Sequence, residues 1–424
     1  MKSNKKVDVE LEDKQEGKMN KKKDYMKQKH IDGDKVVKNK DSVKIFERYL
    51  KAAEQGRADA QFYLGICYAT GTGVTKDLTT AVEWYRKAAE QGNVEAQRFL
   101  GLCYMEGIGV MEDLTKAADW YRKAAEQGCA EAQCNLGTYY ADGAGVTKDL
   151  TKAIEWYRKS AEQGYAKAQV NLGVCYAEGT GVTKDLAKAV EWYRKAAEQG
   201  NAAAKYNLGL YYTHHTGVAK DLTTAVEWYR KAAEQGNVEA QFNLGTCYLN
   251  GIGVTKDFAK AADWYQKAAE QGCAEAQLNL GICYVTATGV MQDLTKAMEL
   301  FHKAAEQGNA DAQRYLGACY AEGPGVTKDL TKAAEWFRKS AEQGNAYAQY
   351  NLASCYETGD GVKKDLTKAA EWYWKSAEQG DVRAQMKLKE LNMRNSRGHP
   401  RSSYLSNAAQ VAEPGEKETI KQTQ

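Results

Sequence analysis

The sequence predicts an all-α protein in which 36-residue helix-turn-helix repeats stack into an α/α solenoid. The first observation is a strict period, because the string A-E-Q-G recurs every 36 residues in one register. The second is that apolar residues inside each period recur at helical spacing. A fixed period of this length is typical of arrays in which each unit buries its apolar face only against its neighbours. The string ends at Gly56, Gly92, Gly128, Gly164, Gly200, Gly236, Gly272, Gly308, Gly344 and Gly380.

The first half of each repeat, for example residues 94–106, is predicted to be a helix. Ala96, Leu100, Cys103 and Tyr104 make one apolar stripe at helical spacing. An asparagine directly precedes this helix in five repeats and suits its N-cap, because an asparagine side chain can accept a hydrogen bond from the first turn. The five are Asn93, Asn201, Asn237, Asn309 and Asn345.

A turn of the form G-x-G-V-x-x-D and a second helix complete the repeat. Gly107 can adopt the left-handed conformation that ends a helix, and Asp113 stands where the next N-cap is expected. The second helix is then predicted over residues 114–126. Its recurring Trp-Tyr pair, here Trp120 and Tyr121, is interpreted as core.

The array is predicted to span residues 41–392, with nine full repeats over 57–380. Residues 41–56 match a second helix alone, and residues 381–392 match a first helix alone. Such half-repeats suit the two ends of a solenoid, which need polar outer faces.

Beyond the array, residues 1–40 and 393–424 are charged or unpatterned, and we expect disordered tails. The whole chain has a net charge of +3, but residues 1–40 carry +5 and residues 394–424 carry +2, which leaves the array at −4. Because a nucleic-acid-binding solenoid would carry basic repeats, no nucleic-acid partner is expected. The first 30 residues contain no apolar run and no stretch approaches 18 apolar residues, so neither a secretory signal nor a membrane span is expected.

The positions of the ten cysteines do not indicate a disulfide framework. Seven share one register, directly before a tyrosine of the first helix, and no second cysteine recurs within each repeat to pair with them. We interpret them as buried free thiols that act as small hydrophobes. The seven are Cys67, Cys103, Cys175, Cys247, Cys283, Cys319 and Cys355.

Three positions of the first helix vary while the rest of the repeat is constant. Their i, i+4, i+7 spacing places them on one helix face, which is called the variable face below. They are either a ligand-binding surface or residues that merely pack against each other. The first row is Phe62, Arg98, Cys134, Val170, Tyr206, Phe242, Leu278, Arg314 and Tyr350. The second is Ile66, Leu102, Thr138, Val174, Leu210, Thr246, Ile282, Ala318 and Ser354, and the third is Ala69, Met105, Ala141, Ala177, Thr213, Leu249, Val285, Ala321 and Glu357.

An asparagine ladder runs beside the first row. An amide offers both a donor and an acceptor, which suits the backbone of an extended peptide, although hydrogen bonding between repeats is an equal alternative. The ladder is Asn135, Asn171, Asn207, Asn243, Asn279 and Asn351.

The repeat resembles the Sel-one-like repeat, a relative of the tetratricopeptide repeat. The resemblance rests on A-x-A-Q-x-x-L-G-x-C-Y-x-x-G-x-G-V-x-x-D-x-x-K-A-x-x-W-Y-x-K-A-A-E-Q-G and covers residues 41–392. It implies a right-handed α/α superhelix that serves as an adaptor, with the variable face and the asparagines on the concave, peptide-binding side. A secreted, cysteine-rich branch of the family pairs a first-helix cysteine with one in the second helix, where this chain has Ala88 and Ala89.

No pattern of catalytic or metal-binding residues stands out. The only S-x-x-K, at Ser3, has no companion β-lactamase motif. His214 and His215 are adjacent, and adjacent residues on a helix make a poor chelate. G-x-G-V lacks the Lys-Ser/Thr of a phosphate-binding loop.

We therefore expect a cytoplasmic, monomeric, non-enzymatic scaffold without cofactor or metal that binds a protein or extended peptide. The residues expected to contact the partner are Phe62, Arg98, Asn135, Asn171, Tyr206, Asn207, Phe242, Asn243, Asn279, Arg314, Tyr350 and Asn351. One alternative is a β-lactamase-like hydrolase. Another is the same scaffold used as a bacterial effector or host-contact factor after leaderless secretion.

Overall fold

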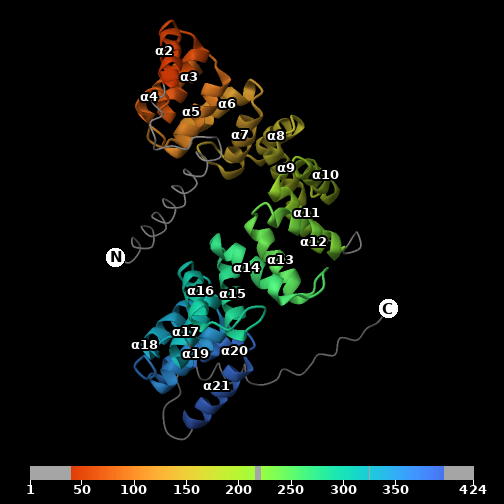
Figure 1. Cartoon of the computed structure of the whole chain (residues 1–424). Coiled ribbons are helices and arrows are strands. Elements are labelled where there is room, and N and C mark those ends of the chain that lie inside the picture. The colour runs from red at the N-terminus through yellow and green to blue at the C-terminus, as the bar shows by residue number, and fades with distance from the viewer. Residues whose placement is uncertain (1–39, 215–220, 324, 396–424) are drawn as a thin grey trace. The chain divides into compact units, whose positions relative to one another are not determined.

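The computed structural model of the chain describes residues 40–214, 221–323 and 325–395, and all regular structure in these ranges is α-helical (Figure 1). The first helices of the nine repeats are α3 (Ala58–Thr70), α5 (Val94–Glu106), α7 (Ala130–Asp142), α9 (Ala166–Glu178), α11 (Ala202–His214), α13 (Val238–Asn250), α15 (Ala274–Thr286), α17 (Ala310–Glu322) and α19 (Ala346–Thr358). The second helices are α4 (Leu78–Glu90), α6 (Leu114–Glu126), α8 (Leu150–Glu162), α10 (Leu186–Glu198), α12 (Leu222–Ala233), α14 (Phe258–Glu270), α16 (Leu294–Glu306), α18 (Leu330–Glu342) and α20 (Leu366–Glu378). The predicted all-α solenoid of helix-turn-helix repeats is confirmed.

Helices α2 (Lys40–Glu54) and α21 (Val382–Asn395) flank the nine pairs. The two tails expected to be disordered lie outside the described residues, apart from Lys40 and residues 393–395, which belong to these helices. None of the described helices is long and apolar enough to cross a membrane.

The chain forms two compact units, residues 1–204 and 205–424. Within each unit a first helix packs against the second helix of its own repeat and against that of the preceding repeat, as α13 does with α14 and α12. This stacking of neighbours is what the strict period predicts, because no repeat buries its apolar stripe alone.

The predicted caps are present at both ends of the helices. Asp257 accepts a hydrogen bond from the backbone of Lys260 at the start of α14, and Asn237 accepts one from Ala240 at the start of α13. These bonds satisfy backbone N–H groups that have no partner within the helix. Wherever the residue after a first helix is described, it is left-handed; it is Ala287 (φ 56°) after α15 and a glycine in the other cases.

The second glycine of the turn lies directly against the main chain of the preceding repeat. Gly253 has φ 66°, and a Cβ placed there would lie 2.1 Å from the carbonyl oxygen of Leu222, at the start of the preceding repeat's second helix. Only glycine fits this contact, because a side chain would both strain the backbone and overlap another main chain.

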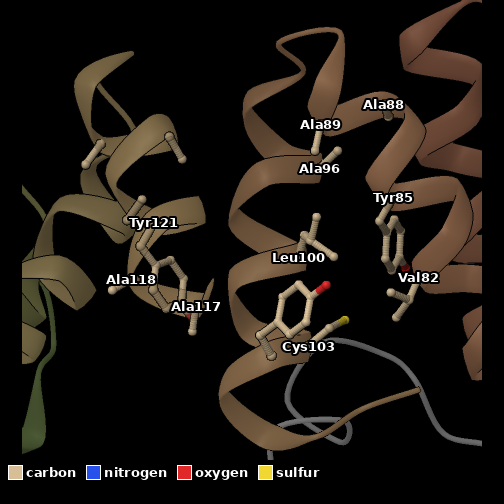
Figure 2. Packing of buried hydrophobic residues seen from close by; sticks show 14 of the residues in the cluster. Val82, Tyr85, Ala88, Ala89, Ala96, Leu100, Cys103, Ala117, Ala118 and Tyr121 are labelled. Atoms are coloured by element: carbon tan, nitrogen blue, oxygen red, sulfur yellow. The ribbon is translucent and has the colours of Figure 1, made fainter. Parts of the chain in front are cut away.

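The core of each repeat is formed by the constant residues. Figure 2 shows Leu100 and Cys103 of α5 on the side that faces Val82 and Tyr85 of α4. Leu100 and the second-helix Tyr121 are both fully buried. The two residues of the Trp-Tyr pair differ in burial: the tyrosine lies in the core, and the adjacent tryptophan is half-buried at the surface.

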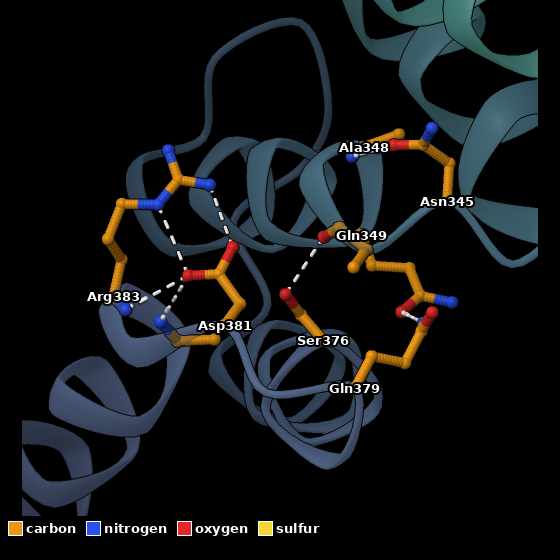
Figure 3. Close-up of polar contacts among 9 residues, drawn as sticks. Asn345, Ala348, Gln349, Ser376, Gln379, Asp381 and Arg383 are labelled. Atoms are coloured by element: carbon orange, nitrogen blue, oxygen red, sulfur yellow. Dashed lines mark hydrogen bonds and ion pairs between the residues drawn. The ribbon is translucent and has the colours of Figure 1, made fainter.

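A glutamine of the first helix is the main buried polar group. In Figure 3, Gln349 accepts a hydrogen bond from Gln379, at 2.8 Å. The amide of Gln349 also donates to the carbonyl of Ala341 in the preceding repeat. Ser376 likewise donates to the carbonyl of Ala346 at 2.8 Å. These buried polar groups of Gln349 and Ser376 thus have partners, which avoids the cost of desolvating them alone.

All ten cysteines are free thiols, and those of the common register are buried or half-buried. Burial raises the pKa of Cys103 to about 12 and that of Cys247 to about 11. At neutral pH these thiols are therefore protonated, in keeping with their interpretation as small hydrophobes.

Candidate protein-binding face

The twelve residues expected to contact a partner all lie on first helices, but they differ in burial. Phe62 and Arg98 are buried. The other ten are half-buried, so each combines a packed part with an exposed part. They are Asn135, Asn171, Tyr206, Asn207, Phe242, Asn243, Asn279, Arg314, Tyr350 and Asn351.

Phe62 is part of the core of the first repeats. Its ring centroid lies 5.8 Å from that of Tyr85 and 5.4 Å from that of Phe99. With 7 % of its surface exposed, Phe62 offers little area to a partner. Phe62 thus packs within the chain, as the alternative interpretation of the variable face expects, and Cys134, Val170 and Leu278 of the first row are buried as well.

Half-buried aromatic residues of the first row rest on a second-helix tyrosine. The ring centroids of Phe242 and Tyr265 are 5.8 Å apart, and those of Tyr350 and Tyr373 are 5.4 Å apart. These contacts fix one side of each first-row ring while the residue keeps an exposed part. A ring held in this way loses little conformational freedom when a ligand covers it.

The asparagine ladder is joined to the first row of the preceding repeat at two places. Asn243 donates to the hydroxyl of Tyr206 at 3.5 Å, and Asn171 lies 3.8 Å from the sulfur of Cys134. Bonding between repeats is therefore realised at these two asparagines. Three others, Asn135, Asn207 and Asn351, make no side-chain hydrogen bond to another described residue.

Arg98 shows how the structure satisfies a first-row arginine. Its guanidinium pairs with Glu95 of its own helix at 2.8 Å and with Glu131 of the next repeat at 2.9 Å. The side chain is 5 % exposed. Arg98 is thus neutralised within the chain by two carboxylates.

Arg314 occupies the same position six repeats later with different neighbours. Its nearest carboxylate oxygen belongs to Asp311, 3.9 Å from Nε, and Tyr347 stands at the position equivalent to Glu131, the second partner of Arg98. The Nε atom is buried and has no hydrogen-bond partner among the described residues. The guanidinium carbon lies 4.0 Å from the ring centroid of Tyr315 and 5.6 Å from that of Tyr347.

A hollow of about 220 Å³ opens beside Arg314. It exists where the second row has Ala318, the smallest residue of a row that elsewhere carries isoleucine, leucine, valine, threonine or serine. The lining is largely apolar and draws on all three rows of the variable face. It comprises Val285, Leu294, Ala297, Phe301, Arg314, Tyr315, Ala318, Cys319 and Glu322.

Sequence reasoning missed the exposed Tyr347 and the cover that α21 provides. Tyr347 is 57 % exposed, and the guanidinium of Arg383 lies 4.4 Å from the ring centroid of Tyr350. The signal for Tyr347 was available, since an aromatic residue there replaces the acidic residue of several other repeats.

Residues that could bind a metal ion do not cluster in the described part of the chain. It contains no group of three or more His, Cys, Asp or Glu side chains that could hold a metal ion. Among the histidines of the sequence analysis, His214 is exposed at the end of α11 and His215 lies outside the described residues.

Comparisons with known proteins agree with the repeat structure. The Sel1 repeat model matches nine consecutive segments, residues 58–93, 94–129, 130–165, 166–201, 202–237, 238–273, 274–309, 310–345 and 346–381. One similar solved structure is c5321 of uropathogenic Escherichia coli, described as a protective antigen with an SLR fold. It is 39 % identical over 86 % of each chain, with a TM-score of 0.59. Another is a Sel1 repeat protein of Oxalobacter formigenes, 36 % identical over 73 % of this chain and 89 % of that one, with a TM-score of 0.54. A search of curated proteins gave no match.

Proposed function

Because the chain belongs to the Sel1 repeat family, we propose that it is a non-enzymatic scaffold that binds a protein or extended peptide along the variable face of its first helices. The repeats build one stable frame from constant residues and leave three rows of each first helix to differ. Protein recognition needs this combination of a rigid support and side chains that vary from place to place.

The observation that carries the proposal is the incomplete neutralisation of Arg314. The chain itself shows, at Arg98, that a first-row arginine in this frame takes two carboxylates. Arg314 has one acidic neighbour at 3.9 Å, an unbonded Nε and an apolar hollow beside it. A carboxylate from a partner would form the charge-assisted hydrogen bonds that Arg314 lacks.

The ligand chemistry follows from these neighbours. An acidic group would pair with Arg314, and a neighbouring apolar side chain would enter the hollow at Ala318. Asn351, which lies on the first helix of the repeat after that of Arg314 and has no side-chain bond to another described residue, would hydrogen-bond the peptide backbone. We therefore propose that the partner segment at this site is an extended peptide with adjacent acidic and apolar residues.

The test is selection of binders from a random peptide library with the wild-type protein, followed by affinity measurements on variants. Ala318→Ile fills the hollow with the residue that the preceding repeat carries at the same position, Ile282. The fold should therefore tolerate this substitution. Arg314→Ala removes the charge. Each variant is expected to weaken the selected peptides at least tenfold.

A matched control changes the second helices instead. Glu227→Ala and Glu335→Ala alter exposed residues of α12 and α18 and should leave the affinity unchanged. Selected peptides that bind the Ala318 and Arg314 variants as tightly as the wild type would contradict this assignment.

The similarity to c5321 supports a second context for the same scaffold, contact with a host. That protein, 39 % identical to this chain, is described as a protective antigen of uropathogenic strains. Secretion of the tagged protein into the medium by intact cells would support this context, and its strict retention with a cytoplasmic marker would oppose it. The S-x-x-K at Ser3, on which the β-lactamase-like alternative would depend, has no companion motif and lies outside the described residues.

A further inference from the structure

A tryptophan lies at the surface of eight of the nine second helices, and each is covered by a lysine three residues later. The lysine nitrogen is 3.8 to 4.5 Å from the centre of the indole ring in all eight repeats. A cation at this distance over an aromatic face is attracted by the ring. The tryptophans are Trp84, Trp120, Trp156, Trp192, Trp228, Trp264, Trp336 and Trp372.

Each indole occupies the same kind of place. Trp336 packs against the core cluster that Tyr320 and Val326 also border. Trp84 packs against the buried cluster of Ala53, Ala60 and Leu64, which Ala52 of the preceding helix and Tyr68 of its own repeat also border. The site that surrounds each indole is thus formed by the preceding second helix, a first-helix tyrosine and the valine of the turn.

The repeat over residues 274–309 keeps this place but lacks the ring. Leu300 stands where the others have tryptophan, and Tyr284 and Val290 remain beside it. A hollow of about 420 Å³ lies there, with Ala262 and Leu280 in its lining. It is on the second-helix side of the repeat, separate from the variable face, so it does not depend on the proposed function.

The rim of this hollow also keeps its cation. Lys303 lines it and follows Leu300 by three residues, as the lysines over the eight indoles follow theirs. No aromatic ring of the described residues lies beneath Lys303 at a comparable distance. Two basic and two acidic side chains line the rim, so its charges balance and a neutral ring is favoured over an ion.

We propose that the hollow at Leu300 binds the side chain of a tryptophan from a partner protein. At the eight equivalent positions of the other repeats, an indole fills this space beneath a lysine. A tryptophan entering from outside would bury its ring against Tyr284 and Val290 and gain the cation of Lys303. Tryptophan is also one of the residues enriched among the side chains that carry most interface energy.

The test uses N-acetyl-5-fluorotryptophanamide as the probe and full-length protein, with fluorine NMR line broadening as the readout. Wild type should broaden the probe signal, and an excess of N-acetyltryptophanamide should reverse the broadening, whereas N-acetylleucinamide should not. Leu300→Trp restores the common residue and should both abolish binding and raise the melting temperature. Lys303→Met should weaken binding severalfold without loss of helical signal.

Trp336→Leu provides the matched gain of function, because it creates the same hollow one repeat later beneath Lys339, now 3.9 Å from the ring. This variant should bind about two probe molecules where the wild type binds one. The proposal is overturned if wild type does not broaden the probe. It is equally overturned if Leu300→Trp still binds it as wild type does or melts at a lower temperature. These outcomes do not require the Trp336 variant to fold.

Discussion

Gln271 donates a hydrogen bond to the side-chain oxygen of Gln241 at 2.7 Å, and Gln241 in turn donates to the carbonyl of Ala233 at 3.0 Å. One buried glutamine therefore ties its own repeat's second helix to that of the repeat before. The same arrangement recurs in seven other repeats, with side-chain distances between 2.6 and 2.9 Å. Lys205 replaces the glutamine in the remaining repeat and donates to Gln235.

Gln241→Ala should lower the free energy of unfolding by about 1–3 kcal/mol, because it leaves a buried carbonyl without its donor and Gln271 without its acceptor. Chemical denaturation followed by circular dichroism measures this change. Gln271→Ala is the control. It should lower the free energy of unfolding by less, because Gln271 is exposed and water can take the place of its amide. Equal costs for the two variants would show that the buried bond to Ala233 contributes nothing.

Two glycines of left-handed conformation should respond differently to alanine. A Cβ at Gly253 would meet the carbonyl oxygen of Leu222 at 2.1 Å, whereas a Cβ at Gly272 would meet nothing within 4 Å. Gly272→Ala should cost about 1–2 kcal/mol for backbone strain alone. Gly253→Ala should cost clearly more, because adjacent repeats must also separate. Thermal unfolding of both variants checks the order, and a reversed order would refute the close contact at this turn.

Ala287→Gly should stabilise the protein. Ala287 has φ 56° and is the one non-glycine residue of the described chain with positive φ. Glycine relieves about 1 kcal/mol of backbone strain in the folded state. This gain exceeds the free energy that is lost because glycine raises the conformational entropy of the unfolded chain. The melting temperature should therefore rise, and Ala305→Gly, inside helix α16, should lower it. A lower melting temperature for Ala287→Gly would mean that the turn is not strained.

The repeat could be predicted from the sequence because its cause is local. Apolar spacing, capping residues and turn glycines act within a few positions, and these predictions for α13, the turn and α14 hold. The burial of Arg98 could not be predicted, because it depends on Glu131 in the next repeat. The hollows at Ala318 and Leu300 likewise depend on how side chains from three helices fill space. The sequence shows that Ala318 and Leu300 differ from the residues at the same position of the other repeats. The size of the hollow at each of them follows only from how the neighbouring side chains pack.

The thiols should react slowly in the folded protein. Burial raises the pKa of Cys103 to about 12 and those of Cys247, Cys319 and Cys355 to about 11, so their thiolate fraction at pH 8 falls by about a hundredfold or more. The stability linked to these neutral thiols is present below their unfolded pKa and is lost as pH rises toward the folded values. Iodoacetamide labelling with mass spectrometry should modify the half-buried Cys129 first.

A reducing agent should leave the melting temperature unchanged, because all ten thiols are free. A large fall in stability on reduction would reveal structural disulfides. Rapid labelling of Cys103 in the native protein at pH 8 would show that its burial is wrong.

The most direct test of the central claim is site-specific photo-crosslinking to a peptide selected by the wild-type protein. Benzoylphenylalanine replaces Phe242 on the variable face in one sample and the exposed Glu227 of α12 in another. We expect covalent peptide adducts from position 242 and none from position 227, with both proteins equally helical. Adducts from position 227 with none from position 242 would show that the partner binds the second helices and that the variable face is not the site.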